Sequence, residues 1–279
     1  MQQLDGKVAV VTGTGSGIGR ALALRFGAEG MKVVAADVER RALDETGALL
    51  HEAGVDALVQ PTDVSDAAAV DALAAATYER FGATHVLCNN AGVFQGGVLW
   101  QRSDDDWRWV LGVNVYGIVH GIRAFVPRMI EAGGEGHVVN TASMAGITTA
   151  AYSGPYHVSK FAAVALSECL ANDLRATGSS IGVSVLCPGA VDTRIAFSTR
   201  NRPTAVPDEA AAPDAHFVEQ ALRDLASKGL EPAAVAGMVV DAIRAERFWV
   251  PTNDSYDDQV RTRYEDMIAR RAPRSTDYD

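Results

Sequence analysis

Residues 7–30 read KVAVVTGTGSGIGRALALRFGAEG. The stretch opens with a continuous apolar run at 7–12, which is typical of a parallel strand covered on both faces. Closely spaced glycines follow, and Ile18, Leu22 and Phe26 then recur at the four-residue spacing of an amphipathic helix. Backbone N–H groups at a helix N-terminus of this kind can bind a phosphate group. The stretch therefore predicts a strand–turn–helix unit with an anion site at its turn.

The rest of the chain alternates strands and helices in the same way. Apolar runs predict further strands at 32–36, 55–60, 85–88, 137–141, 181–187 and 248–250. Helical periodicity predicts helices up to about residue 53 and at 65–81, 104–130, 154–177 and 232–246. This alternation predicts an α/β fold with a doubly wound, seven-stranded parallel sheet. We expect residues 1–253 to form this single domain, and residues 254–279 a polar tail with a short helix near 257–271.

Composition and charge exclude several classes of protein. The 279 residues carry 25 basic and 35 acidic side chains, and this net charge of −10 repels phosphate backbones, so we expect no nucleic-acid partner. We find no apolar run near the roughly 18 residues of a membrane span, and no secretory signal, so we expect a cytoplasmic protein with no membrane partner. Cys88, Cys169 and Cys187 form no Cys-x-x-Cys pair and predict three buried, reduced thiols. The histidines lack metal-ligand spacing, so we predict no metal.

An acidic residue follows the second predicted strand. The glycines fit the pattern Thr-Gly-x-x-x-Gly-Ile-Gly, and Asp37 stands 18 residues after the last of them, Gly19. A carboxylate there can accept hydrogen bonds from both ribose hydroxyls of NAD and would repel the 2′-phosphate of NADP. Arg40 and Arg41 could instead pair with that phosphate, although the glycine turn itself, with Ser16, holds no basic residue. The pattern favours NAD.

A tyrosine and a lysine stand four residues apart in one predicted helix. At this spacing Tyr156 and Lys160 share a face. A free phenol has a pKa near 10, and a neighbouring cation and hydrogen-bond donors favour the phenolate, which predicts a lowered pKa and an acid/base role for Tyr156. The adjacent His157 points in another direction and is predicted to pack or lie on the helix surface.

These motifs and others resemble the classical short-chain dehydrogenase/reductase family over residues 7–195, and imply its Rossmann fold. The matching segments are Thr12-Gly13 to Gly19, Asp63-Val64, Asn89-Asn90-Ala91-Gly92, Asn114, Ser143, Tyr156 with Lys160, and Pro188-Gly189. They occur in the family's order, and the interval of 13 residues from Ser143 to Tyr156 is also that of the family.

The resemblance implies a role for each matched position. Tyr156 would exchange the proton of the substrate hydroxyl, Ser143 would orient the substrate oxygen, and Lys160 would lower the pKa of the tyrosine. Asn114 would hold a water that links Lys160 to solvent. The implied cofactor-binding residues are Gly13, Ser16, Gly17, Ile18, Gly19, Asp37, Asp63, Val64, Asn90, Tyr156, Lys160, Val191 and Thr193.

The implied activity is NAD-dependent interconversion of a secondary alcohol and its ketone. An NADPH-dependent ketoreductase and a non-catalytic nucleotide sensor are the alternatives. Residues 114–130 and Leu230-Glu231-Pro232 resemble the Cα-dehydrogenases that oxidise lignin-derived aryl-ether alcohols. We read 199–214 as a loop, within a substrate lid at about 195–228 that covers a bulky, apolar or aromatic substrate. The helices at 104–130 and 154–177 carry small or apolar residues on several faces, which together with the resemblance predicts a homotetramer.

Overall fold

The computed structural model describes residues 1–203 and 213–274. One sheet of seven strands runs through the molecule in the order β3-β2-β1-β4-β5-β6-β7, and every neighbouring pair is parallel. The strands are β1 (Val8–Thr12), β2 (Lys32–Asp37), β3 (Ala57–Pro61), β4 (Val86–Asn89), β5 (Gly136–Thr141), β6 (Ile181–Cys187) and β7 (Trp249–Pro251). The winding reverses between β1 and β4, where such sheets open a ligand-binding crevice at the carboxyl ends of their strands. The predicted doubly wound fold is confirmed.

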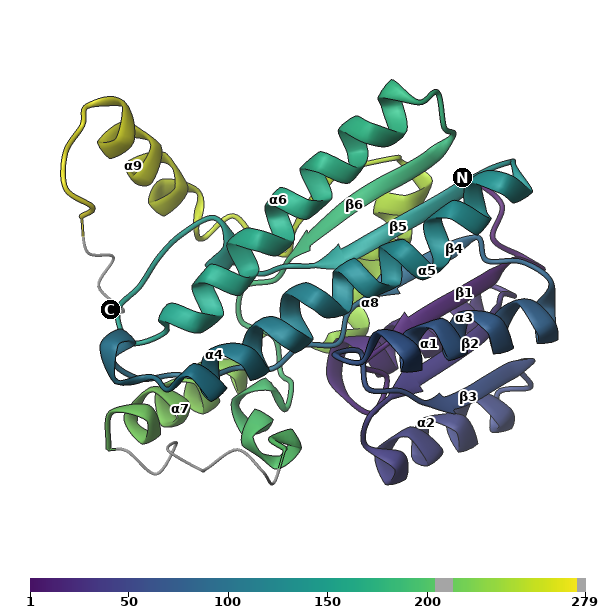
Figure 1. Cartoon of the computed structure of the whole chain (residues 1–279), viewed down its shortest axis with the longest axis horizontal. Coiled ribbons are helices and arrows are strands. Elements are labelled where there is room, and N and C mark those ends of the chain that lie inside the picture. The colour runs from purple at the N-terminus through teal and green to yellow at the C-terminus, as the bar shows by residue number, and fades with distance from the viewer. Residues whose placement is uncertain (204–212, 275–279) are drawn as a thin grey trace.

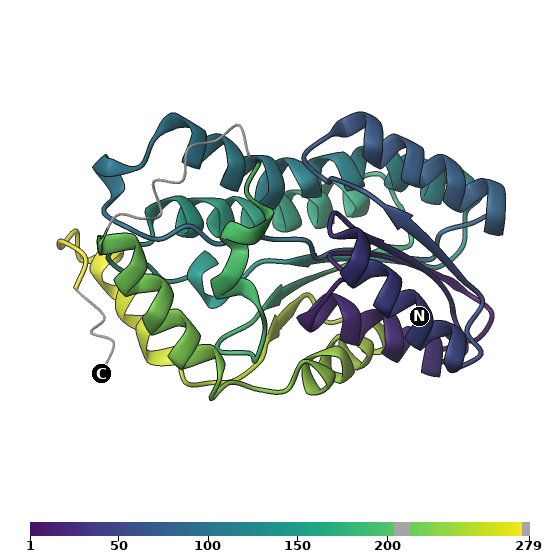
Figure 2. The ribbon, with the colours of Figure 1, turned by 90° about the horizontal axis from the view of Figure 1, so that it is seen from below.

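Helices cover both faces of the sheet (Figures 1 and 2). One layer contains α1 (Gly17–Ala28), α2 (Arg40–Glu52) and α8 (Pro232–Arg244). The other contains α3 (Ala67–Phe81), α4 (Asp104–Leu111), α5 (Gly117–Ala132) and α6 (Gly154–Ala176). Because both faces are covered, the central strands are apolar throughout, and all five residues of β1 are buried.

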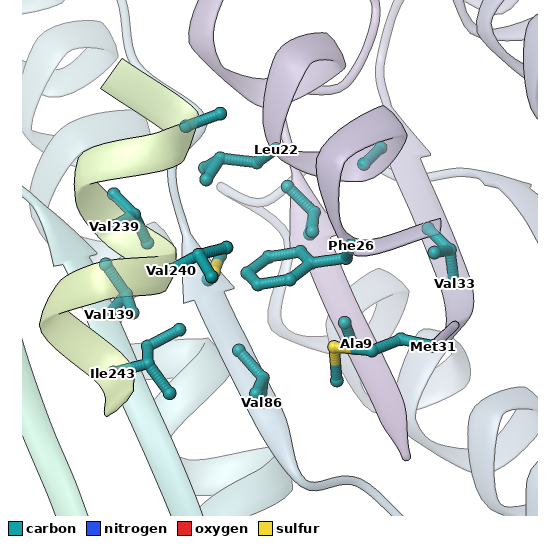
Figure 3. Close-up of a cluster of buried hydrophobic side chains, with 14 of the residues drawn as sticks. Ala9, Leu22, Phe26, Met31, Val33, Val86, Val139, Val239, Val240 and Ile243 are labelled. Carbon is teal, nitrogen blue, oxygen red and sulfur yellow. The ribbon is translucent and has the colours of Figure 1, made fainter. Parts of the chain in front are cut away.

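The core beneath α1 and α8 fixes the helix that follows the glycine turn (Figure 3). Leu22 and Phe26 of α1 and Ile243 of α8 are fully buried and lie in one apolar cluster over β1 and β4. Truncating a buried phenylalanine typically destabilises a protein by about 3–5 kcal/mol, so this packing holds the start of α1 firmly beside the sheet edge.

The predicted helix at 104–130 changes from α-helical to π-helical winding where Asn114 lies. α4 and α5 are joined by a π-helical turn, η2 (Gly112–Tyr116), so that helix continues from Asp104 to Ala132. By length and composition alone it could cross a membrane, which corrects the expectation that no stretch is long and apolar enough. In this fold α5 lies along the sheet, and Phe125, Val126 and Met129 are buried in the core.

Among the described residues, the 3₁₀ helix η4 (Ile195–Asn201), α7 (Pro213–Ala226) and α9 (Asp257–Ile268) stand beyond the carboxyl ends of the strands. The stretch 199–214, predicted as a loop, enters helices at both ends, and residues 204–212 of it lie outside the described residues. Pro213 opens α7 at a position where the missing N–H leaves no helical hydrogen bond unmade.

Candidate active site

A cleft of about 860 Å³ lies at the carboxyl edge of the sheet. It brings together every predicted cofactor and catalytic residue except Asn114. They come from the turn after β1 with the start of α1, the ends of β2 to β6 and the first two turns of α6. Because the chain crosses the sheet between these elements, residues as distant as Gly13 and Thr193 line one cavity.

The glycine turn fits closely against its neighbours. Gly13 has φ +73°, and a Cβ there would lie 2.8 Å from the Cα of Ala91. Gly17 has φ +53°, and its Cβ would lie 2.9 Å from Cγ2 of Thr193. An L side chain at either position would combine a strained backbone with a collision. The turn therefore forms a cradle in which only glycine fits at positions 13 and 17.

Asn90 links this cradle to the next strands. Its Nδ2 donates to the Thr12 carbonyl (3.0 Å), and its Oδ1 accepts from the Thr141 hydroxyl (3.2 Å). The Thr12 hydroxyl accepts from the backbone N–H groups of Asn90 and Ala91. The sequence singled out Asn90 but not the hydroxyl of Thr12, whose role depends on a partner 78 residues away.

Asp37 lies at the end of β2 with its carboxylate beside the cradle. Its Oδ2 accepts from the Gly15 N–H and its Oδ1 from the Glu39 N–H, both at 2.8 Å. Burial raises the pKa of Asp37, while these two hydrogen bonds oppose the shift. Asp63, further along the cleft, accepts from the N–H and hydroxyl of Ser65.

Arg40 and Arg41 do not line the cleft. Arg40 pairs with Asp44 at 2.9 Å and Arg41 with Glu45 at 3.5 Å, each one helical turn along α2, and both arginines are exposed. The two basic residues that could have favoured a 2′-phosphate are thus directed away from Asp37 by their own helix.

The tyrosine and serine meet at the other end of the cleft. The phenol of Tyr156 hydrogen-bonds the hydroxyl of Ser143, and its ring packs edge-on against Phe94 with centroids 5.0 Å apart. Burial raises the pKa of Tyr156 to about 12, and the hydrogen bond with Ser143 lowers it only in part. The predicted lowering of this pKa is therefore not found, because burial of the phenol outweighs its polar neighbours.

Lys160 is buried beneath the same tyrosine. Its Nζ donates to the Thr141 carbonyl (3.0 Å) and lies 5.6 Å from the centroid of the Tyr156 ring. Burial lowers the pKa of Lys160 to about 8, although the neighbouring Cys187 raises it slightly. A cation is thus held next to the phenol, as the shared helix face predicts.

Asn114 lies behind the cleft wall. The π turn places its amide against Val93 in the connection after β4, where Oδ1 accepts from the Val93 N–H (2.8 Å) and Nδ2 donates to the Val93 carbonyl (2.9 Å). Nδ2 also donates to the hydroxyl of Ser159, which donates in turn to the Tyr156 carbonyl (2.7 Å). Ser159 is a residue that sequence reasoning missed, and it couples Asn114 to the turn of α6 that carries the tyrosine.

His157 is buried beside the tyrosine. Its Nδ1 hydrogen-bonds the carbonyls of Ala145 and Thr148, and its Nε2 accepts from the Ala150 N–H. Burial lowers the pKa of His157. The ring braces the segment between Ser143 and α6, which agrees with its predicted packing role. Cys169, predicted as buried, is exposed.

Two buried arginines fasten the helices that wall the cleft. Arg202, after η4, forms an ion pair at 2.5 Å with Asp106 of α4, without hydrogen-bond alignment, and both side chains are almost wholly buried. Arg102 pairs with Asp214 of α7 at 3.4 Å, and Asp214 accepts from the Val98 N–H. The chain before residue 204 is therefore anchored to α4, and the chain after residue 212 to the connection between β4 and α4.

The predicted tail also reaches the cleft. Ser255, Tyr256 and Gln259 line it, and the Tyr256 ring lies against the α-carbon of Gly189. Arg263 of α9 stacks over the ring of Phe161 in α6, with 4.8 Å to its centroid. The start of α9 thus packs against the helix that carries Tyr156.

A nicotinamide dinucleotide fits this arrangement. The glycine cradle suits a pyrophosphate at the start of α1, and Asp37 is placed to accept from ribose hydroxyls. Ser143, Tyr156 and Lys160 stand at the opposite end of the same cleft. Among the residues described, no group of histidines, cysteines and acids is arranged to hold a metal ion.

Comparison with known proteins agrees with a nicotinamide dinucleotide site. A short-chain dehydrogenase/reductase from Burkholderia phymatum, solved in complex with NAD, is 43% identical over 100% of both chains, with a TM-score of 0.98. The C alpha-dehydrogenase of Sphingobium sp. is 31% identical over 99% of this chain and 90% of its own, which confirms the predicted resemblance. A variant actinorhodin polyketide ketoreductase, solved with NADPH, is 30% identical over 90% of this chain and 97% of its own, with a TM-score of 0.73. The family model of the short chain dehydrogenases matches residues 7–203. With this match over most of its length, the chain belongs to the short-chain dehydrogenase family of oxidoreductases.

Proposed function

We propose that the protein is an NAD-dependent dehydrogenase that interconverts a bulky secondary alcohol and its ketone. The observation that carries this proposal is the contact of Tyr156 with Ser143, above the buried Lys160, in the cleft that also holds the glycine cradle. When bound, the nicotinamide ring accepts or supplies the hydride. Assay of a panel of aryl and alkyl secondary alcohols by NADH absorbance tests the activity, and no turnover with any of them would favour the nucleotide sensor.

Each polar residue of the site has a defined role in this proposal. The hydroxyl of Ser143 holds the substrate oxygen, and Tyr156 takes the proton from that oxygen in oxidation or returns it in reduction. The ammonium of Lys160 favours the phenolate form of the tyrosine and binds the cofactor ribose. Asn114 positions the tyrosine through Ser159, and the water that the family resemblance assigns to Asn114 remains a prediction.

We expect at least a tenfold preference for NAD over NADP. The carboxylate of Asp37 would repel a 2′-phosphate, and one like-charge contact at partial burial is worth roughly tenfold or more. The measurement is kcat/KM for both cofactors with one alcohol. A preference for NADP would show that the protein is the NADPH-dependent ketoreductase, which is the alternative.

The apolar wall of the cleft supports the proposal that the substrate is large and apolar. It consists of side chains from the connection after β4, the turn after β5, α4, η2 and α7: Phe94, Met144, Trp109, Val113, Phe217, Val218, Leu222 and Leu225. Phe217 is 70% exposed on α7 at the cavity, so a substrate there would bury a ring that water now contacts.

Phe217→Ala is therefore expected to raise KM for bulky aromatic alcohols about tenfold, since about 1–2 kcal/mol of apolar contact is lost. KM for NAD should stay within twofold. Met267→Ala, which removes another exposed apolar side chain on α9, serves as the control. Equal KM values for every bulky alcohol in the Phe217 variant would contradict a substrate wall on α7.

We also propose a cytoplasmic homotetramer and a single catalytic domain over residues 1–253. Tyr116, Ile130 and Val158 are exposed on or beside α5 and α6, which suits helix-to-helix packing between subunits. The three cysteines are unpaired, as in a reducing compartment. The substrate lid proposed over about 195–228 includes η4 and α7.

A further inference from the structure

An ion pair joins the segment just after Asp37 to η4, whose Arg200 lines the cleft. Glu39, which precedes α2, accepts from Nε of Arg200 in η4 at 2.5 Å, and each side chain is 26% exposed. Asn201 also donates to the Glu39 carboxylate. Burial would raise the pKa of Glu39, but the hydrogen bonds from Asn201 and Arg200 and the nearby charges of Arg200 and Arg194 hold it below its ordinary value. Glu39 is therefore a carboxylate committed to this pair.

The position of the Arg200 guanidinium does not depend on Glu39 alone. Its Nη1 donates to the carbonyls of Arg194 (3.0 Å) and Phe197 (2.8 Å), both within or beside η4. Arg200 lines the cleft, and its charge acts on Asp37, lowering the pKa that burial raises. If the Glu39 carboxylate were absent, the guanidinium would still be held at the Asp37 end of the cleft.

The place of this arginine matters for cofactor choice. Asp37 and Arg200 both line the cleft, and Glu39 lies beside Asp37 and is bonded to Arg200, so a 2′-phosphate on a ribose held by Asp37 would approach this pair. Arg40 and Arg41 are paired along the outside of α2 and do not line the cleft. Arg194 and Arg200 both line the cleft, and the charges of both act on Glu39. Arg200 forms an ion pair with the Glu39 carboxylate, so its charge is already compensated.

We propose that Glu39 is a second determinant of cofactor choice, because it engages Arg200 in an ion pair and so withholds from a 2′-phosphate the cation that would bind it. The inference rests on the proposed preference for NAD. Removing the Asp37 charge alone would leave Glu39 in place, and a 2′-phosphate would still compete with a carboxylate for Arg200. Removing both charges would leave Arg200 free to donate charge-assisted hydrogen bonds to the phosphate.

The test compares 5′-AMP with 2′,5′-ADP (adenosine 2′,5′-bisphosphate), two cofactor fragments that differ only in the 2′-phosphate and need no turnover. Isothermal titration gives both affinities for the full-length protein, for Asp37→Asn and for Asp37→Asn/Glu39→Gln. We expect the second change to tighten 2′,5′-ADP by at least about tenfold relative to 5′-AMP, the effect of one charge-assisted hydrogen bond. Adding Arg200→Ala should abolish this gain, whereas adding Arg40→Ala, the matched control, should preserve it.

The single variant Glu39→Gln provides a second measurement should the double variant fail to fold. It should improve the affinity for 2′,5′-ADP relative to 5′-AMP by about threefold, and only while Arg200 is present. The inference is overturned if removing Glu39 gives no gain, or if the gain survives Arg200→Ala and is lost with Arg194→Ala. An unmodified protein that binds 2′,5′-ADP as tightly as 5′-AMP would instead contradict the proposed NAD preference.

Discussion

Replacing Tyr156 with phenylalanine is expected to lower kcat by about 10²–10⁴-fold, the usual contribution of a positioned acid/base. Only the phenolic oxygen can exchange a proton with the substrate, and the variant removes that atom alone. The ring retains its edge-on contact with Phe94, so the fold and the affinity for NADH, measured by fluorescence titration, should change less than threefold.

Tyr152→Phe is the matched control for this substitution. Tyr152 lines the same cleft, four residues before Tyr156, and is 51% exposed. Its loss of a hydroxyl should alter kcat less than about fivefold, because an exposed hydroxyl away from the Ser143 contact does no proton transfer. Near-normal turnover by the Tyr156 variant would show that the phenol is not the acid/base, whatever the control shows.

The pKa of this tyrosine illustrates what sequence patterns omit. The four-residue spacing correctly predicted that Lys160 would lie beside Tyr156. The same reasoning predicted a lowered pKa, whereas burial raises the pKa of Tyr156 to about 12. Spacing specifies which groups are neighbours on one helix, but the degree of desolvation depends on Phe94 and the cleft wall, which come from other parts of the chain.

Local patterns were sufficient for most of the sheet and for the residues that line the cleft. The strand predicted at 181–187 matches β6 residue for residue, because a run of apolar residues between turns is a local signal. The glycine cradle and Asp37 were predicted because they adjoin such strands. The helix α7 was missed because prolines and alanines before it obscured its apolar spacing, with Phe217, Val218, Ala221 and Leu222 on one side.

Long-range ion pairs could not be predicted. Arg200 and Glu39 are separated by 161 positions, and neither belongs to a motif that suggests the other. The buried pair of Arg202 with Asp106 joins segments whose proximity follows only from the order of the strands. These pairs hold η4 against the body of the protein, so they help to define the substrate and cofactor ends of the cleft.

Replacing Lys160 with methionine is expected to remove most turnover and to change how stability depends on pH. Burial lowers the pKa of Lys160 from 10.5 to about 8, so the unfolded chain holds this proton more tightly than the folded one. Below pH 8 the lysine is charged in both the folded and the unfolded state. Its desolvation then opposes folding by the full free energy that corresponds to the pKa shift, about 3 kcal/mol. As the pH rises from about 8 towards 10.5 this penalty disappears, and the natural protein gains stability relative to the variant.

Urea unfolding of both proteins at pH 7 and pH 10 measures the effect. The variant also loses the hydrogen bond to the Thr141 carbonyl, which costs about 1–3 kcal/mol, but this loss does not vary with pH. The difference in unfolding free energy between the two proteins should therefore shift by about 2 kcal/mol in favour of the natural protein between these pH values. Lys228→Met, which removes an exposed lysine, should show no such shift. If the unfolding free energies of the Lys160 variant and the natural protein changed with pH in the same way, burial of the ammonium would carry no desolvation penalty. Lys160 would then be an ordinary base with no depressed pKa.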